Sequence, residues 1–81
     1  MLMVVASGSM SEKHPNNRYY LDGRDDQFPT YSIILLEKVN SPEELKQYDV
    51  IAYVNDKGVN IIHRIFRINS DGTYTTRGDA N

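Results

Sequence analysis

The stretch YDVIAYVNDKGVNIIHRIFRINSDGTYTTRG, residues 48–78, decides the fold class. It holds three runs rich in β-branched and aromatic residues, which are typical of strands, at residues 48–54, 59–68 and 73–78. The runs are separated by NDKG and NSDG, and Asn, Asp and Gly in such short connections favour tight turns. The stretch therefore predicts an antiparallel meander of consecutive hairpins.

The segments before this stretch add strands and one short helix to the expected fold. The run YSIILLEKV, residues 31–39, is apolar and β-branched until its charged end, so it predicts a further strand. Ser41, Pro42 and Glu44 follow in the order of an N-cap, a first helical residue and a capping glutamate, so one helical turn is expected. The opening MLMVVA, residues 1–6, is compatible with an internal strand or with the remnant of a preceding anchor. The predicted fold is mainly β, a small antiparallel meander of four or five strands or a partly open barrel, with one short helical turn.

A long polar segment breaks the strand pattern. Residues 11–28, SEKHPNNRYYLDGRDDQF, are rich in Asn, Asp, Gly and Arg and have no sustained period. Long segments without regular structure are usually functional or disordered. We therefore predict a long polar loop over residues 11–28, directly after the serine motif SGSM at residues 7–10.

Composition and charge limit the class of protein. The 81 residues are expected to form a single domain, 1–81, and the absence of cysteine excludes disulfides, zinc knuckles and thiol nucleophiles. The net charge is −2 and the nine Lys and Arg residues are spread singly along the chain, so nucleic-acid binding is disfavoured. The N-terminal apolar run is far shorter than the roughly 20 residues that a membrane-spanning helix needs, so this chain is expected to be soluble.

The two histidines differ in their expected surroundings. A serine hydroxyl becomes a good nucleophile only beside a base and oxyanion donors, so each histidine is a candidate base. His14 precedes Pro15 in the polar segment and is expected to be solvated. His63 lies, by strand alternation, on the same face as Ile61 and Ile65, where an imidazole is partly desolvated. From spacing alone, His63 is either a half-buried histidine bonded to a strand neighbour or a catalytic base.

Ser9 and Asp79 are equally ambiguous in isolation. The motif SGSM is like any flexible turn that contains a glycine, and Asp79, after Gly78 at a strand end, is typical of a turn residue. Arg77, Gly78 and Asp79 also spell an integrin-type tripeptide. They offer a non-catalytic interpretation, in which a small β-barrel binding module presents this tip or the 11–28 loop to a partner.

Three blocks taken together resemble the type I signal peptidases. They are SGSM after an apolar segment, YDVIAYV with IIHRIFRI in the middle, and YTTRGDAN at the end. The usual bacterial branch has a lysine general base just before the arginine of the middle strand. His63 followed by Arg64 resembles instead the branch found in archaea, endospore-forming bacteria and the endoplasmic reticulum. The resemblance implies the mainly β fold that signal peptidases share with self-cleaving repressors of the LexA type, a rival whose lysine base is replaced here by His63.

The resemblance implies a role for each motif residue. Ser9 would be the nucleophile, with its main-chain N–H as one oxyanion donor and the hydroxyl of Ser7 as a second. His63 would be the general base, Asp79 the acid that orients it, and Met10 a residue that shapes the substrate cleft.

The resemblance also implies a function and a location. Signal peptidases are serine endopeptidases that remove signal peptides from exported preproteins at the membrane surface, and they bind an extended substrate with small residues at the cleavage site. The chain would be a truncated, extracytoplasmic catalytic domain that is not expected to be active by itself. A membrane anchor is expected before residue 1 and a last family aspartate beyond Asn81. Its partners would be preproteins and the membrane surface, without nucleic acid, metal or cofactor. Two departures affect the substrate groove, since the 11–28 segment is longer than in the family and Tyr48–Asp49 stands where Gly–Asp is customary.

Overall fold

The chain forms antiparallel β-structure in two compact units, which are described separately. The computed structural model describes residues 2–36 and 38–81. Within these residues, the first unit consists of residues 2–36 with 78–81 and the second of residues 38–77. The strands are β1 (Leu2–Val4), β2 (Ile33–Leu35), β3 (Val50–Val54), β4 (Asn60–Ile68) and β5 (Tyr74–Arg77). The mainly β, antiparallel prediction is confirmed, although the described strands form two separate sheets and no closed barrel.

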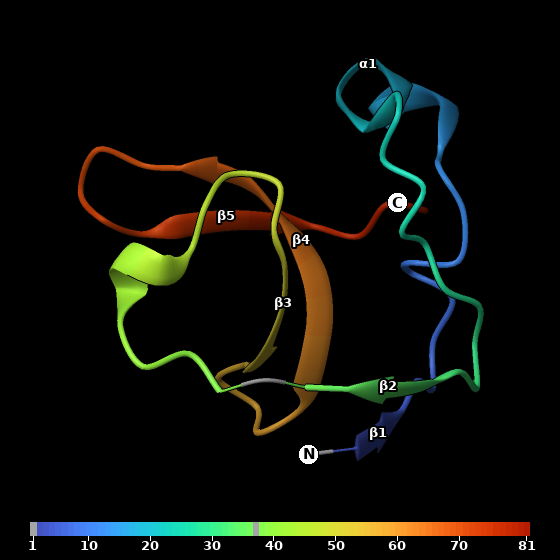
Figure 1. Cartoon of the computed structure of the whole chain (residues 1–81), viewed down its shortest axis with the longest axis horizontal. Coiled ribbons are helices and arrows are strands. Elements are labelled where there is room, and N and C mark those ends of the chain that lie inside the picture. Colours follow the sequence, from blue (N-terminus) through green and yellow to red (C-terminus); the bar gives the residue numbers. More distant parts are fainter. Residues whose placement is uncertain (1, 37) are drawn as a thin grey trace. The chain divides into compact units, whose positions relative to one another are not determined.

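The second unit is the predicted meander, with β4 between β3 and β5 (Figure 1). Between β3 and β4, Ile51 lies opposite His63 and Tyr53 opposite Ile61. The hydroxyl of Tyr53 lies 2.7 Å from the Thr76 hydroxyl, so a side-chain hydrogen bond also joins the two outer strands. In such a sheet, the backbone N–H and C=O groups of each strand form hydrogen bonds with the neighbouring strands.

Both turns of the meander contain the residues that their backbone requires. Gly58 and Gly72 have φ angles of 76° and 87°, where a Cβ is strained. In the first turn, Asn55 Oδ1 accepts hydrogen bonds from the N–H groups of Lys57 and Val59, at 2.9 and 3.0 Å. The side chain of Asn55 therefore closes the hairpin that NDKG predicted.

The pairing of β4 with β5 contains an irregularity that the strand pattern did not predict. The register shifts between Ile65 and Arg67, as at a β-bulge. Beside this shift, the guanidinium carbon of Arg77 lies 4.2 Å from the centroid of the Phe66 ring, in a cation–π contact.

The strands predicted at residues 31–39 and 48–54 both begin two residues late, for the same reason. Tyr31 and Tyr48 have φ angles of 69° and 74°, a left-handed conformation that interrupts a strand. As a result β3 begins at Val50 and β2 at Ile33. The strand β2 ends at Leu35, within the predicted strand 31–39. Glu37 in that strand and Met1 in the N-terminal run lie outside the described residues.

The predicted helical turn is present as η2, a 3₁₀ helix over Pro42–Glu44. The hydroxyl oxygen of Ser41 accepts a hydrogen bond from the N–H of Glu43 at 3.3 Å. In return, the carboxylate of Glu44 accepts one from the N–H of Asn40 at 3.0 Å. This reciprocal arrangement is close to the capping box that the sequence predicted.

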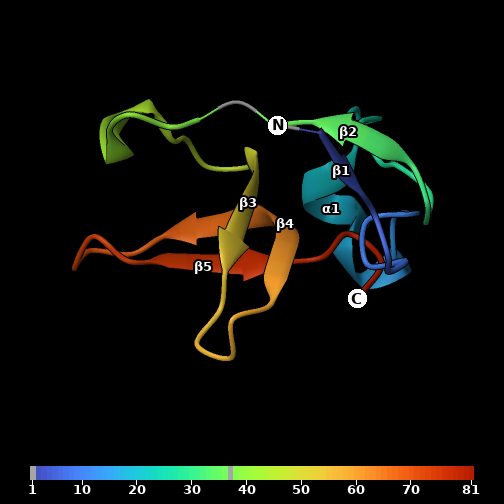
Figure 2. The ribbon, with the colours of Figure 1, turned by 90° about the horizontal axis from the view of Figure 1, so that it is seen from below.

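In the first unit, β1 and β2 pair antiparallel (Figure 2). Met3 lies opposite Ile34. Residues 2–4 of the N-terminal apolar run therefore form a strand. The polar segment 11–28 contains two short helices that the prediction of a loop did not include, η1 (Pro15–Asn17) and α1 (Arg18–Leu21). His14 Nδ1 caps η1 by accepting the N–H of Asn16 at 3.1 Å, and Leu21 is fully buried, so capping and burial together stabilise these turns.

Candidate active site

The serine motif forms a tight turn after β1. The amide and the hydroxyl of Ser11 both donate to the carbonyl oxygen of Gly8, at 3.0 and 2.7 Å. Within the turn the hydroxyl oxygens of Ser7 and Ser9 are 3.3 Å apart, with Ser7 exposed and Ser9 half-buried. A group that reaches the Ser9 hydroxyl is therefore also close to the Ser7 hydroxyl.

The segment 78–81 packs against this turn. The N–H of Ala80 donates to the carbonyl oxygen of Ser9 at 2.8 Å. A Cβ on Gly78 would lie 2.7 Å from that same oxygen and 2.9 Å from the Ser9 Cβ, closer than side-chain carbons approach such atoms. Residue 78 must therefore be glycine for the segment to lie on Ser9, which gives the Gly–Asp pair of the last motif a physical reason.

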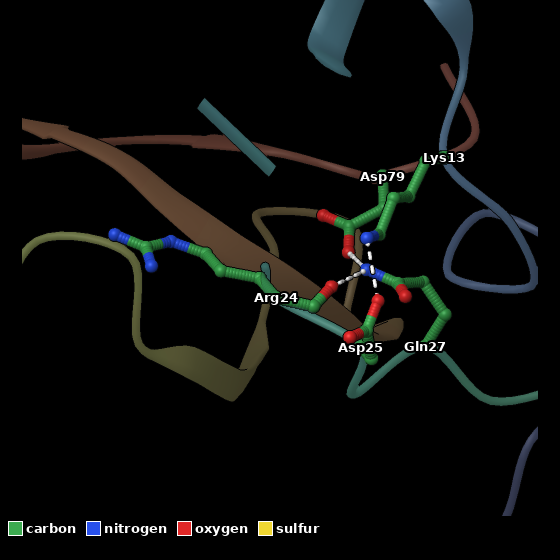
Figure 3. A network of polar contacts seen from close by, with 5 residues as sticks. All are labelled: Lys13, Arg24, Asp25, Gln27 and Asp79. Carbon is green, nitrogen blue, oxygen red and sulfur yellow. Dashed lines mark hydrogen bonds and ion pairs between the residues drawn. The ribbon is translucent and has the colours of Figure 1, made fainter. Parts of the chain in front are cut away.

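The carboxyl group of Asp79 is buried and hydrogen-bonded (Figure 3). Gln27 Nε2 donates to Asp79 Oδ2 and also to the carbonyl oxygen of Arg24, each at 2.8 Å. An ion pair between Lys13 Nζ and Asp25 Oδ1, at 2.7 Å, lies beside these bonds. A buried carboxylate is costly without donors, so the amide of Gln27 stabilises its burial.

The main chain around Asp79 is held by the polar segment. The N–H of His14 donates to the carbonyl oxygen of Asp79 at 2.7 Å. Asn17 is fully buried, and its Nδ2 donates to the carbonyl oxygens of Asp79 and Asn81 at 3.1 and 2.8 Å. The polar segment is therefore part of the candidate site, where it binds residues 79–81.

Met10 is buried, and its sulfur accepts a hydrogen bond from the N–H of Asp79 at 3.4 Å. The carbonyl oxygen of Met10 accepts the N–H of Phe28 at 2.9 Å. Met10 thus links the serine turn to both the polar segment and the C-terminal residues. Its predicted contribution to a substrate cleft stays a prediction.

The tripeptide of Arg77, Gly78 and Asp79 is not presented to solvent. Gly78 is buried and Asp79 is fully buried. Recognition of such a tripeptide requires its aspartate to reach a partner, so the hypothesis of an exposed binding tip is wrong.

His63 belongs to the second unit, where it lies in β4 opposite Ile51 and is half-buried. Its strand neighbour Ile65 is fully buried. The first unit thus brings together Ser7, Ser9, Met10 and Asp79. The pairing of Ser9 with His63 stays a prediction.

Two residues of this constellation were missed by sequence reasoning. Asn17 and Gln27 stand in a polar run that gives no periodic signal, and each contacts a residue more than 50 positions away in the sequence. The one clue was the position of the long polar segment directly after the serine motif.

The described residues contain no cluster of three or more His, Cys, Asp or Glu side chains suited to a metal ion. Among the same residues, no helix has the length and apolar character needed to cross a bilayer.

The comparison with known proteins gives one partial relative. No family model matches the chain, and no solved structure matches it. The chain is 33% identical over 60 residues to a protein of Bacillus subtilis (strain 168) named signal peptidase I W. The match covers 70% of this chain and 32% of that protein, so the chain spans about a third of the length of this curated relative. The partial match supports a relationship to the type I signal peptidases.

Proposed function

We propose that the protein is a serine endopeptidase that removes signal peptides from exported preproteins at the extracytoplasmic face of a membrane. The observation that carries this proposal is the partial match to a protein named signal peptidase I W. The packing of Gly78 and Ala80 on the main chain of Ser9 supports it, because it joins the first and last motifs of the resemblance in one unit.

The proposed chemistry follows the serine–histidine mechanism. Ser9 Oγ attacks the scissile carbonyl carbon while His63 accepts the hydroxyl proton. The N–H of Ser9 and the hydroxyl of Ser7 stabilise the oxyanion, in keeping with the 3.3 Å between the two hydroxyl oxygens. The carbon–nitrogen bond then breaks, His63 protonates the leaving amine, and water hydrolyses the acyl-enzyme. Asp79 is the proposed acid of the site.

We further propose that the base is a histidine and that the protein belongs to the branch found in archaea, endospore-forming bacteria and the endoplasmic reticulum. The observation behind this finer proposal is the pair His63–Arg64 in β4. A histidine base predicts loss of cleavage on His63→Ala and no rescue by His63→Lys at neutral pH, because a lysine must also be desolvated to serve as a base.

The test uses membranes that contain the protein expressed from its complete gene, with a preprotein supplied in detergent. Mass spectrometry of the products locates the cleaved bond. We expect Ser9→Ala and His63→Ala each to lower kcat by about 10³-fold or more. Ser70→Ala, at an exposed serine in the β4–β5 turn, is the matched control and keeps full activity. Undiminished cleavage by Ser9→Ala would remove this serine from the mechanism and overturn the proposal.

A further inference from the structure

We propose that Gln27 is a positioning residue that fixes the orientation of the Asp79 carboxylate. This inference rests on the proposed function, in which Asp79 is the acid of the site. It assigns a task to the polar segment 11–28, which is longer than the resemblance to signal peptidases predicts.

The geometry of the Gln27 amide carries the inference. A glutamine Nε2 has two hydrogens, and here the two acceptors are the carbonyl oxygen of Arg24 and Asp79 Oδ2, each at 2.8 Å (Figure 3). With both hydrogens engaged, the plane of the amide is set by the main chain at Arg24. The bond to Oδ2 then sets the rotation of the carboxyl group and hence the direction of Oδ1.

The main chain is hydrogen-bonded on both sides of Gln27, so the position from which its side chain extends is fixed. Before it, the N–H of Arg24 donates to the carbonyl oxygen of Leu21 at 2.8 Å, at the end of α1. After it, the N–H of Phe28 donates to the carbonyl oxygen of Met10 at 2.9 Å. The second of these bonds ties Phe28, the residue after Gln27, to the serine turn.

Burial strengthens the hydrogen bond between Gln27 Nε2 and Asp79 Oδ2. Asp79 is fully buried, and a hydrogen bond to a charged group in such surroundings is stronger than one at the surface. Asn17 and His14 hold the main chain of Asp79 by its carbonyl oxygen, so their bonds do not act on its carboxyl group. Gln27 acts on the carboxyl group itself, so its removal changes orientation while the main-chain bonds stay in place.

The activity test is a double-mutant cycle in the membrane-embedded protein. Gln27→Met removes both donors and keeps the length of the side chain. We expect it to lower kcat about 10-fold, with KM changed less than about twofold, because misplacement of a catalytic group costs rate. In an Asp79→Ala background the same substitution should cause no further loss, since the carboxylate that it orients is gone. Asp79→Asn replaces Asp79→Ala if the alanine variant fails to fold.

Gln47 supplies the matched control, because its Nε2 also donates to a main-chain carbonyl oxygen, that of Phe66 at 3.2 Å. Gln47→Met should leave kcat and KM unchanged. Equal kinetics for Gln27→Met and Gln47→Met would overturn the positioning role. Equal losses from Gln27→Met with and without Asp79 would overturn it too, since they indicate a purely structural effect.

A second readout separates this inference from the proposed function. The side-chain amide signals of Gln27 in the isolated 81-residue chain are assigned by nuclear magnetic resonance as the pair that Gln27→Met removes. They should shift on Asp79→Ala, while those of Gln47 stay in place. Absence of that shift overturns the inference. If the unsubstituted protein cleaves no preprotein, the proposed function fails, and the amide signals still decide whether Gln27 holds Asp79.

Discussion

The two units reach their order by different means. In the meander of residues 38–77, the side-chain bonds that close the turns join residues two to four positions apart. In the first unit, the side chains of Asn17, Gln27 and Met10 bind residues 79–81, which lie 52 to 69 positions away in the sequence. This difference indicates that residues close in the sequence specify the strands and turns of the meander. The candidate site in the first unit depends instead on contacts between distant parts of the chain.

Among the substitutions considered, Gly78→Ala should disrupt the long-range contacts of the first unit most severely. The added Cβ would lie 2.7 Å from the Ser9 carbonyl oxygen, a main-chain atom that cannot move aside cheaply. We expect a loss of about 3 kcal/mol or more in the free energy of unfolding of the first unit, measured by urea titration. Hydrogen exchange at the Ala80 amide should accelerate, while amides of β4 change less.

Gly8→Ala is the control for this substitution. Its Cβ would meet Ser11 Oγ at 3.4 Å and Thr30 Oγ1 at 3.5 Å, which are ordinary contacts. The expected change is within about 0.5 kcal/mol. Equal stability of the Gly78→Ala and Gly8→Ala variants would contradict the packing of Gly78 on Ser9.

Asn17→Ala should weaken the same unit by a smaller amount. The substitution removes the donor to the carbonyl oxygens of Asp79 and Asn81. A loss of about 2 kcal/mol, measured by urea titration, is expected because the variant loses two hydrogen bonds and a fully buried side chain. Asn16→Ala, at the exposed neighbour, should change stability little. A similar loss from both variants would mean that helix propensity, and not the distant bonds of Asn17, sets the effect.

Gly58→Ala tests whether a turn of the meander depends on local contacts alone. The glycine has a φ angle of 76° and open space around its Cβ position, so strain alone decides the effect. We expect about 1 kcal/mol of destabilisation, with the increase in hydrogen exchange centred on the β3–β4 hairpin. Gly58→Asn should lose less stability, because asparagine tolerates this left-handed conformation. A larger effect at the Ala80 amide than at the hairpin would contradict the local character of this turn.

Asp71→Asn should have the smallest effect, and one that depends on pH. Hydrogen bonds from the Thr73 hydroxyl, at 2.6 Å, and from its N–H, at 3.0 Å, lower the pKa of Asp71 below its usual 3.8. Because the folded pKa is the lower one, this contribution to stability is present above pH 3.8 and is lost as the pH falls through the folded value.

Thermal unfolding of Asp71→Asn and of the unsubstituted chain at several pH values tests this expectation. The stability difference should be present at neutral pH and shrink at acid pH. Thr73→Val should reproduce part of it, since it removes the hydroxyl donor. A difference that grows as the pH falls below 3.8 has the wrong sign and would refute the assignment.

The meander was largely predictable because its signals are local. Asn55 and Gly58 specify one turn, and Ser41 with Glu44 specifies the capping of η2. The strand ends were less predictable. Tyr48 has a left-handed backbone, and nothing about a tyrosine side chain favours that conformation.

The candidate site was predictable only where motifs mark it. Ser7, Ser9, Met10 and Asp79 came from the resemblance, and the structure places them in one unit. Asn17 and Gln27 could not be predicted, since their partners lie far along the chain and polar residues in a loop have many possible partners. Long-range polar contacts depend on the folded backbone, which periodicity does not describe.

The bond between Asn17 and Asp79 has a consequence for synthesis of the chain. These residues are 62 positions apart, and all of residues 38–77 are made between them. At roughly 5 to 20 residues per second, Asp79 follows Asn17 from the ribosome by roughly 3 to 12 s. The serine turn is therefore made seconds before the residues 79–81 that pack on it. The contacts that hold residues 79–81 on the serine turn therefore become possible only after both hairpins of the meander have been synthesised.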